Sequence, residues 1–468
     1  MNPALQSLFE EQREKAREFR LEPVSGRIHR LRRLLDYVLS HQEDIITALH
    51  DDFQKPREEV QTSEIYPVVS EIRHAIENLR AWVEPKLVDT PLGLLGSRAE
   101  IRYEAKGVCL IIAPWNFPFN LCLGPLASCL AAGNTAVIKP SEMTPHTSAL
   151  VRRLVEELFH RSEVAVAEGG VEVASELLKL PFDHVFFTGS PAVGKIVMRA
   201  AADHLTSVTL ELGGKSPVII DETADLRQTA DRIAFGKFLN VGQTCIAPDY
   251  VLVHVSVKDQ FLHFLKESTL RLFSAGGGFP QAPSYGRIVN DRHFDRVMML
   301  LEEGRKRGAR EVLSGPIDRP GRLIPPHILE LKDSESQLMQ EEIFGPILPV
   351  LGFDHLEEAI QSVNKLPKPL ALYIFSKRRQ TLARIEKEIS SGTVVFNDCI
   401  IQFTHVNLPF GGIGNSGIGK SHGYFGFLAF SNEKATLKQR WGATTPNLLY
   451  PPYSKFKHWV IKIMIKWL

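Results

Sequence analysis

The sequence contains few cysteines for its length. Five occur in 468 residues, an odd number, and none belongs to a Cys-x-x-Cys pair. This usage excludes a disulfide framework and the common zinc and redox motifs, and it is typical of a reducing compartment. Three of the five lie within apolar patterns and are assigned to packing, namely Cys109, Cys122 and Cys129.

The sequence also lacks an excess of either charge. Lys and Arg together number 55, against 54 for Asp and Glu, so the formal net charge is +1. A surface with so little net charge produces no long-range field that would attract polyanions. Nucleic-acid binding is therefore not expected.

Long apolar runs are absent as well. No stretch has the roughly 20 apolar residues that a membrane-spanning helix needs. The N-terminal segment is rich in charged residues and has no apolar core, unlike a secretory signal. These features predict a cytoplasmic protein.

The apolar patterns that are present predict an α/β fold of at least two domains, since the chain exceeds what one core usually supports. Residues up to about 85 have helical periodicity, and residues 86–106 are predicted to form an exposed hairpin outside the main sheet. Residues 107–212 alternate apolar strands with helices, and a second such series covers 218–396. This pattern indicates parallel sheets covered on both faces, with ligands at the strands' carboxyl ends and between the two halves.

Two predicted strand ends carry residues suited to a nucleotide. The segment that contains Gly189, Ser190 and Gly194 leads from a strand into a helix, but it lacks the middle glycine of the dinucleotide fingerprint. Lys139 and Glu142 follow another strand, where they are placed to contact ribose hydroxyls. From spacing alone, a plain strand-to-helix turn and a solvated capped loop are the more common interpretations.

A cysteine, a glutamate and an asparagine suggest covalent catalysis. Cys245 follows a polar turn that contains a glycine, and Glu211 ends a predicted strand upstream of it. A thiolate is a nucleophile and a carboxylate activates water, so the two suit successive steps. Asn116 lies between prolines, which suits a fixed oxyanion donor. For each residue alone, burial or a structural turn is the better interpretation.

Seven motifs occur in a fixed order along the chain. They are PWNFP from 114, KPSE from 139, FTGS from 187, ELGGKSP from 211, GQTC from 242, EEIFGP from 341 and LPFGG from 408. Together they resemble the NAD(P)-dependent aldehyde dehydrogenase superfamily over about residues 10–440. The stretch GQTCIAPDY and the ending LPFGGIGNSGIGKSHG are most similar to its class-three branch, which includes fatty and aromatic aldehyde enzymes.

The resemblance implies an aldehyde dehydrogenase-like fold. Such a fold has a Rossmann-type NAD-binding domain, an α/β catalytic domain and a β-hairpin arm for oligomerisation, and class-three enzymes are usually dimers. A homodimer is therefore expected. The domain limits that follow are 1–85 with 107–211 for NAD binding, 212–400 for catalysis, 86–106 with 401–440 for the arm, and 441–468 for an amphipathic tail.

The resemblance also implies the reaction. Cys245 is the nucleophile that attacks an aldehyde to give a thiohemiacetal, whose oxyanion is held by the side chain of Asn116 and the Cys245 N–H. Loss of hydride to the nicotinamide leaves a thioester, and Glu211 activates the water that hydrolyses it to the acid. No metal is needed.

On the cofactor side, the family pattern assigns roles to seven residues. Lys139 and Glu142 contact the adenosine ribose, and a carboxylate at 142 should repel a 2′-phosphate, so NAD is expected to be preferred while NADP use stays open. The remaining five are Gly189, Ser190 and Gly194 near the pyrophosphate, and Glu342 and Phe344 at the nicotinamide ribose.

The C-terminal tail departs from the shorter family members. Residues 455–468 have the pattern of a helix with Lys455, Lys462 and Lys466 on one narrow face and apolar residues around the rest. At about 1.5 Å per residue this helix is too short to cross a membrane of roughly 30 Å. It is expected either to lie at a membrane surface or to dock on a subunit, and either role favours an apolar aldehyde substrate.

Two other functions compete with aldehyde oxidation. A coenzyme A-acylating aldehyde dehydrogenase uses the same cysteine, but such relatives generally lack the glutamate that is present here as Glu211. A structural protein of the same superfold, such as a lens crystallin, predicts decay of the catalytic set, yet Asn116, Glu211, Cys245 and Glu342 are all present. Aldehyde oxidation is therefore favoured.

Overall fold

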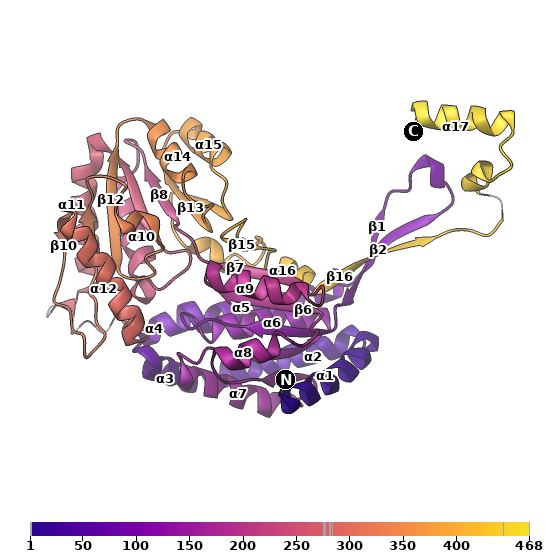
Figure 1. Cartoon of the computed structure of the whole chain (residues 1–468), viewed down its shortest axis with the longest axis horizontal. Helices are drawn as coiled ribbons and strands as arrows, with labels where there is room; N and C mark the ends of the chain where they lie inside the picture. Colours follow the sequence, from indigo (N-terminus) through magenta and orange to yellow (C-terminus); the bar gives the residue numbers. More distant parts are fainter. Residues whose placement is uncertain (1, 275–277, 280–281, 283, 443, 468) are drawn as a thin grey trace.

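The protein consists of two α/β bodies and a projecting arm (Figure 1). The computed structural model describes residues 2–274, 278–279, 282, 284–442 and 444–467. Each body has its own sheet, and the arm extends away from the first body and carries the C-terminal helix at its tip. The predicted α/β fold class is confirmed.

The first body is built on a six-stranded sheet with the order β15-β7-β6-β3-β4-β5. Strands β3 to β7 are parallel, and β15 pairs with β7 in the antiparallel sense. The five predicted strands of residues 107–212 are all present. The bounds are β3 (Val108–Ile112), β4 (Thr135–Lys139), β5 (Val164–Val166), β6 (His184–Gly189), β7 (Ser207–Leu212) and β15 (Gly417–Ile418).

Helices cover both faces of this sheet, which explains why its strands are apolar throughout. In β3, Cys109 and Ile111 face one apolar cluster, while Val108, Leu110 and Ile112 face the other. The first cluster is completed by α2 (Val24–Ser40), α3 (Gln42–Phe53), α5 (Tyr66–Trp82), α6 (Asn120–Ala132), α7 (Pro145–Leu158) and α16 (Gly423–Ala429). The second is completed by α1 (Pro3–Leu21), α8 (Val171–Leu177) and α9 (Pro191–Ala202).

The second body contains a seven-stranded sheet with the order β10-β11-β12-β9-β8-β13-β14. All neighbouring strands are parallel except the antiparallel pair of β10 and β11. Neither of these two strands was predicted; β10 is a largely exposed edge strand without an apolar run. Its strands are β8 (Pro217–Ile220), β9 (Tyr250–His254), β10 (Arg310–Leu313), β11 (His327–Glu330), β12 (Ile347–Phe353), β13 (Ala371–Phe375) and β14 (Thr393–Phe396). Its helices are α10 (Leu226–Phe238), α11 (Lys258–Phe273), α12 (Asp291–Lys306), α13 (Gln337–Gln340), α14 (Leu356–Asn364) and α15 (Arg379–Glu388).

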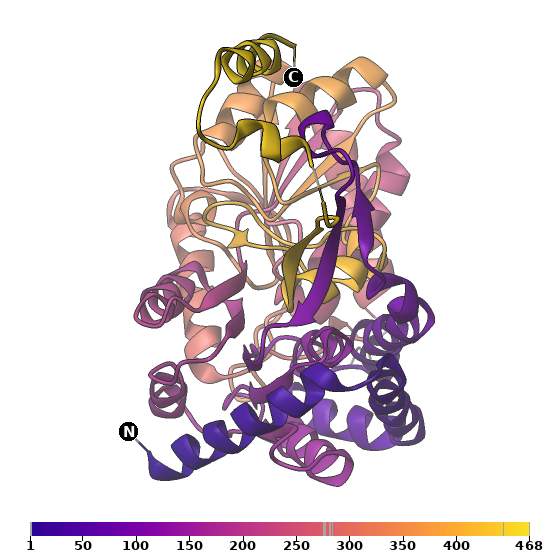
Figure 2. The same ribbon diagram turned by 90° about the vertical axis from the view of Figure 1, so that its right-hand side faces the viewer.

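The arm is a three-stranded antiparallel sheet in which the predicted hairpin is joined by a strand from near the C-terminus. β2 (Arg98–Ala105) lies between β1 (Lys86–Val88) and β16 (Ser431–Lys438), as Figure 2 also shows. Within the predicted 401–440 segment, β16 belongs to this sheet, whereas β15 joins the first body's sheet and α16 packs in its core. The limits of the domains stay a prediction.

The tail forms the expected helix, α17 (Lys455–Trp467). In Figure 1 it lies at the tip of the arm, far from both bodies. There the Cε atom of Met464 lies near Gly93 in the short helix η2 (Leu92–Leu94), 3.7 Å from where a Cβ would stand. Among the described residues, no helix has both the length and the apolar character needed to cross a membrane.

Candidate active site

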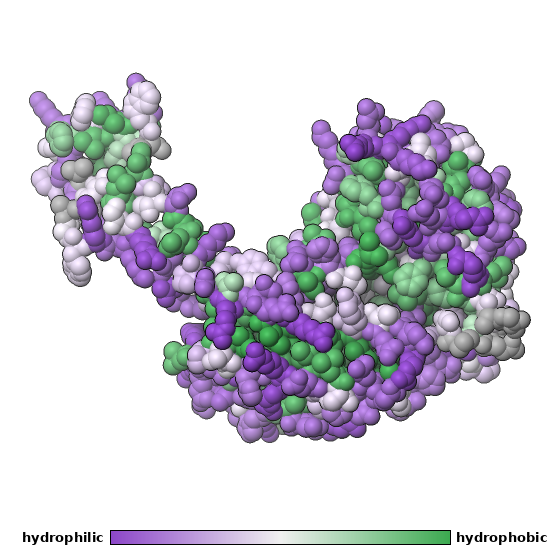
Figure 3. Space-filling model, turned by 180° about the vertical axis from the view of Figure 1, so that it is seen from behind, coloured by the Kyte–Doolittle hydropathy of each residue, from purple (hydrophilic) through white to green (hydrophobic). Residues whose placement is uncertain are grey.

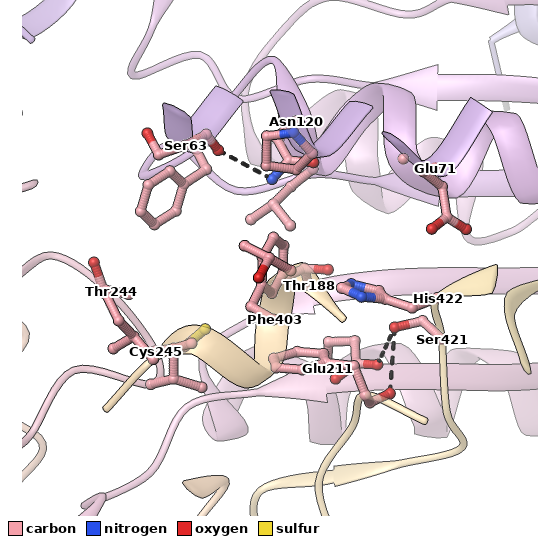
Figure 4. A pocket seen from close by; sticks show the side chains of 18 of the residues that line it. Ser63, Glu71, Asn120, Thr188, Glu211, Thr244, Cys245, Phe403, Ser421 and His422 are labelled. Carbon is pink, nitrogen blue, oxygen red and sulfur yellow. Dashed lines mark hydrogen bonds between the residues drawn. The ribbon is translucent and has the colours of Figure 1, made fainter. Parts of the chain in front are cut away.

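A cavity lies where elements of the two bodies meet. Its volume is about 270 Å³, and most of its lining is apolar. The first body contributes residues of α5, α6 and the ends of β6 and β7, and the second contributes the segment after α10 and residues 400–406. Figure 4 shows that both Cys245 and Glu211 face this cavity, whereas their joint action stays a prediction.

Cys245 lies just after an unusual turn. The preceding residues Asn240, Val241 and Gly242 have φ values of 51°, 57° and 72°, so three successive residues adopt the left-handed conformation. Such a conformation is strained for a β-branched valine, and strain of this kind tends to occur at functional sites. The cysteine side chain is half-buried at the cavity wall.

The environment of Cys245 favours the neutral thiol. Burial raises the pKa of this thiol to about 12, and the carboxyl groups of Glu342 and Glu211 add to the rise. Because a thiolate is the reactive form, the cysteine reacts slowly in these surroundings.

Glu211 is the next-to-last residue of β7 and is almost fully buried. One carboxyl oxygen accepts a hydrogen bond of 2.9 Å from the hydroxyl of Ser421, and the other oxygen has no partner among the described residues. Burial raises the pKa of this carboxyl to about 8, against smaller opposing effects of Ser421 and the Lys420 cation. In Figure 4 the carboxyl turns toward Ser421, away from Cys245.

Asn116 lies beside the cysteine loop. Its side-chain Nδ2 donates to the carbonyl of Gln243 at 3.0 Å, two residues before the cysteine. An amide nitrogen carries two hydrogens, so one remains for a second acceptor. The structure thus brings Asn116 and the Cys245 loop together, as predicted.

Glu342 and Phe344 belong to one turn of the second body. The carboxyl of Glu342 lies against Gly213, where any side chain would collide with it. Burial raises the pKa of Glu342 to about 8, and the negative charge of Asp249 adds to this effect. Phe344 has a φ of 45° and its ring meets that of Trp115 edge-on, with centroids 5.3 Å apart.

The predicted pyrophosphate segment forms the start of α9. Gly189 ends β6, and Ser190 caps the helix by accepting a hydrogen bond of 3.4 Å from the N–H of Val193. The helix N-terminus offers free N–H groups and a positive dipole end, which suit a phosphate. Gly194 packs against Leu212, where a side chain would collide with the leucine.

Lys139 and Glu142 form an ion pair at the end of β4. The ammonium of Lys139 is buried and donates to the Glu142 carboxylate at 2.7 Å, while Glu142 is exposed. The pair presents one acceptor and one donor at a solvent-facing strand end. This combination fits the two hydroxyl groups of a ribose.

The sequence prediction missed several residues around the site. Lys55 and Glu64 form a fully buried ion pair at 2.7 Å, and the same ammonium donates to the Asn116 carbonyl at 3.3 Å. Arg296 donates to the carbonyls of Glu342, at 3.1 Å, and Ile343, at 2.5 Å. The bonds of Lys55 to Asn116 and of Arg296 to Glu342 and Ile343 join residues 46 to 61 positions apart, so no local pattern reveals them.

No group of His, Cys, Asp and Glu in the described part of the chain is suited to hold a metal ion. The sites instead consist of a thiol, a buried carboxyl, an amide, and a glycine-rich strand end that leads into a helix. This fold and site define an NAD(P)-type α/β oxidoreductase with a cysteine in its catalytic cleft.

The chain belongs to the aldehyde dehydrogenase family, whose model matches residues 4–436. It is an aldehyde dehydrogenase of the class-three type, as expected. Such enzymes oxidise aldehydes to acids with NAD or NADP.

Similar proteins cover almost all of the chain. The 4,4'-diaponeurosporen-aldehyde dehydrogenase of Staphylococcus aureus is 45% identical over 435 residues, which are 93% of this chain and 94% of that protein. Aldehyde dehydrogenase family 3 member A2 of Macaca fascicularis is 42% identical over 441 residues, covering 94% and 89%. The solved structure of the substrate-bound state of Staphylococcus aureus AldH superposes with a TM-score of 0.94 at 42% identity, covering 99% of this chain and 100% of that one.

The raised pKa of Cys245 predicts slow, strongly pH-dependent alkylation. In the protein without cofactor, the rate with iodoacetamide is expected to rise about tenfold per pH unit between pH 7 and 9, because the thiolate fraction does so below the pKa. Mass spectrometry of the Cys245 peptide measures the rate, with Cys245→Ser as the blank. A plateau below pH 9 would contradict the assigned environment.

Proposed function

We propose that this enzyme oxidises apolar aldehydes to carboxylic acids by way of a covalent intermediate on Cys245. The observation that carries the proposal is that one apolar cavity is lined by both Cys245 and Glu211, with Asn116 bonded to the loop before the cysteine. A nucleophile, an oxyanion donor and a base are the three groups that acyl transfer through a thioester needs.

In the first step, the Cys245 sulfur adds to the aldehyde carbon and gives a thiohemiacetal. The remaining N–H of the Asn116 side chain and the N–H of Cys245 hold the negative oxygen. Loss of one such donor costs about 3 kcal/mol of transition-state stabilisation. The thiol must first lose its proton, which its raised pKa opposes, so attack depends on a change of the charges around it.

In the last step, Glu211 takes a proton from the water that hydrolyses the thioester. Its pKa of about 8 suits a base that works near neutral pH. The carboxyl has to turn from Ser421 toward the thioester, and only one hydrogen bond, that of the Ser421 hydroxyl, holds it in place.

NAD, when bound, supplies the hydride acceptor of the reaction. The groups proposed to hold it are Lys139 and Glu142 at the adenosine ribose and the turn of Glu342 and Phe344 at the nicotinamide ribose, with Gly189, Ser190 and Gly194 at the pyrophosphate. The capped N-terminus of α9 and the buried ammonium of Lys139 support this assignment. The exposed carboxylate of Glu142 favours NAD over NADP, because it repels a 2′-phosphate.

The cavity favours a medium- or long-chain aliphatic or an aromatic aldehyde. Its lining includes Tyr66, Phe117, Leu121, Ile401 and Phe403, and most of the surface that it exposes is apolar. Apolar substrate surface gains about 25 cal/mol per Å² when it leaves water for such a lining.

The arm and tail support a homodimer with peripheral membrane contact. Figure 3 shows apolar residues gathered at the tip of the arm, among them Leu92 and Leu95, which are 60% and 54% exposed. On α17 the apolar Trp459 and Ile465 are 59% and 81% exposed. In its own chain α17 lies far from the cavity (Figure 1), which leaves a membrane surface or a partner subunit as its site. We propose a cytoplasmic dimer whose tails contact a membrane surface.

Turnover of the wild type and of two variants tests the covalent reaction. Wild-type protein with NAD and decanal or benzaldehyde should give a steady rise of NADH absorbance. Glu211→Gln should give one NADH per subunit and then almost stop, because the thioester forms but no base activates water. The rate of thioester hydrolysis in the wild type should rise with pH and level off above about 8, the pKa of Glu211.

Cys245→Ala is the control for this experiment. It should give no NADH while NAD binding, measured by calorimetry, is unchanged. Turnover by Cys245→Ala would place the nucleophile elsewhere, and a wild-type protein inactive with every aldehyde would refute the proposed function.

Cofactor preference depends on Glu142. Glu142→Gln should raise the ratio of kcat/KM for NADP to that for NAD about tenfold, because the variant keeps the side-chain shape but removes the negative charge next to a 2′-phosphate. The exposed carboxylate of Glu433 on β16 offers a matched control, since Glu433→Gln should leave the ratio unchanged. A ratio that also stays constant in Glu142→Gln would remove residue 142 from the cofactor site.

Removal of residues 455–468 should release the enzyme from anionic liposomes. The full chain is expected to sediment with the vesicles through the lysines and apolar residues of α17. The doubly reversed variant Lys462→Glu with Lys466→Glu should bind less and keep its oxidation rate with a short, soluble aldehyde. Unchanged sedimentation of the truncated protein, with a change in its mass by light scattering, would favour docking on the partner subunit instead.

A further inference from the structure

Asn240 joins the two loops that carry the proposed oxyanion donor and the nucleophile. Its Nδ2 donates to the carbonyl of Asn116 at 2.8 Å and to the carbonyl of Gln243 at 3.1 Å. Since Asn116 Nδ2 also donates to the Gln243 carbonyl, the three residues form a closed triangle of hydrogen bonds. All three are buried, so water does not compete for these bonds.

Asn240 also accepts hydrogen bonds. Its backbone carbonyl accepts from both the N–H and the side-chain Nε2 of Gln243, each at 3.0 Å. Gln243 in turn donates to the carbonyl of Arg287 at 3.1 Å and accepts from the N–H of Val289 at 3.0 Å. Gln243, whose carbonyl accepts the Asn116 amide, therefore also fixes the cysteine loop to Arg287 and Val289 of the second body.

The backbone of Asn240 explains why an asparagine suits this position. Its φ of 51° and ψ of 31° are left-handed, and asparagine adopts this conformation more readily than other residues with a side chain. The following Val241 is left-handed too, so the turn persists only if its surroundings impose it. The side-chain bonds of Asn240 are among the contacts that do so.

The same carbonyl of Asn116 also accepts a hydrogen bond from a charged group. The Lys55 ammonium donates to the carbonyl of Asn116 at 3.3 Å and pairs with Glu64 at 2.7 Å. The second oxygen of Glu64 accepts the N–H of Asn120 at 2.9 Å, which fixes the start of α6. The Asn116 carbonyl thus receives two donors, one from each body, Lys55 and Asn240.

We propose that Asn240 is a positioning residue that fixes the Asn116 amide relative to Cys245 and thereby sets the strength of the oxyanion site. This inference rests on the proposed function, in which Asn116 stabilises the oxyanion. Asn240 itself touches no substrate; it acts through Asn116 and the carbonyl of Gln243. Loss of the Asn240 amide should lower the stabilisation of the transition state more than it weakens the binding of the aldehyde or of NAD.

A double-mutant cycle between Asn240 and Asn116 tests the proposal. Asn240→Gly keeps the left-handed backbone and removes only the amide, so kcat should fall about ten- to a hundredfold while KM for NAD stays within about twofold. Asn116→Ala should lower kcat about a hundredfold or more. In the double variant, the glycine should add less than about twofold, because its target is already absent.

A merely structural role for Asn240 gives a different result. In that case the two losses multiply, and the melting temperature and NAD affinity of Asn240→Gly fall together with kcat. The matched control is Asn364→Gly, which removes an amide that donates to the carbonyl of Glu388 at 3.1 Å at the exposed end of α14, and it should leave kcat unchanged. Multiplicative losses overturn the inference while the wild type still oxidises aldehydes, whereas an inactive wild type refutes the proposed function itself.

Discussion

The chemistry depends on the junction between two bodies that fold around separate cores. Glu211 ends a strand of the first sheet, and Cys245 follows a helix of the second, so neither body alone contains both. The hydrogen bond from Asn116 to Gln243 crosses this junction directly. A shift of one body against the other by even one ångström would break it and displace the amide from the thiol.

Burial at this junction has a second effect, since it leaves the key acids neutral. The pKa of Cys245 rises to about 12, and those of Glu211 and Glu342 rise to about 8. Each group becomes harder to ionise because it is buried away from water; the thiol is further affected by the charges of Glu342 and Glu211, and Glu342 by that of Asp249. The raised pKa values therefore favour the protonated forms of Cys245 and Glu211, the proposed nucleophile and base, near neutral pH.

The ionisation of Cys245 therefore depends on the charges around it. A positive charge brought into the cavity would lower the pKa of Cys245 and of both carboxyls at once, whereas deprotonation of one carboxyl raises the pKa of the thiol. Ser421 and Lys420 already oppose the rise at Glu211. The thiol of Cys245 is therefore hardest to ionise when Glu211 and Glu342 are charged.

The sequence predicted the parts of the molecule that have local signals. Most strands of the two sheets, the arm hairpin and the tail helix follow from apolar periodicity and turn residues, whereas β10, β11 and β15 do not; the segments around Cys245, Glu211 and Asn116 follow from motifs. It did not predict β16 as the partner of β2, since the paired residues lie between 326 positions (Ala105 and Ser431) and 340 positions (Arg98 and Lys438) apart in the chain. Pairing across such separations depends on the complete fold.

The contacts that support the site could not be predicted from the sequence either. The Lys55–Glu64 pair is unremarkable among the 55 basic and 54 acidic residues of the chain, and only burial makes it significant. Asn240 precedes the GQTC motif and has no distinctive spacing to Asn116. Its importance lies in the direction of one amide group, which follows from a left-handed turn that residue types alone do not dictate.

The exposed side chains of the arm favour contact with another molecule through its tip rather than through the edges of its sheet. A free strand edge invites pairing with another chain, but β1 has only three residues and β16 carries Glu433 and Lys434. Both edges are therefore poor templates for adding a strand. The exposed apolar side chains lie instead at the tip, on η2 and α17, where Leu92 and Trp459 are 60% and 59% exposed. Contact through the tip removes apolar surface from water, whereas contact through either edge requires charged side chains to be desolvated.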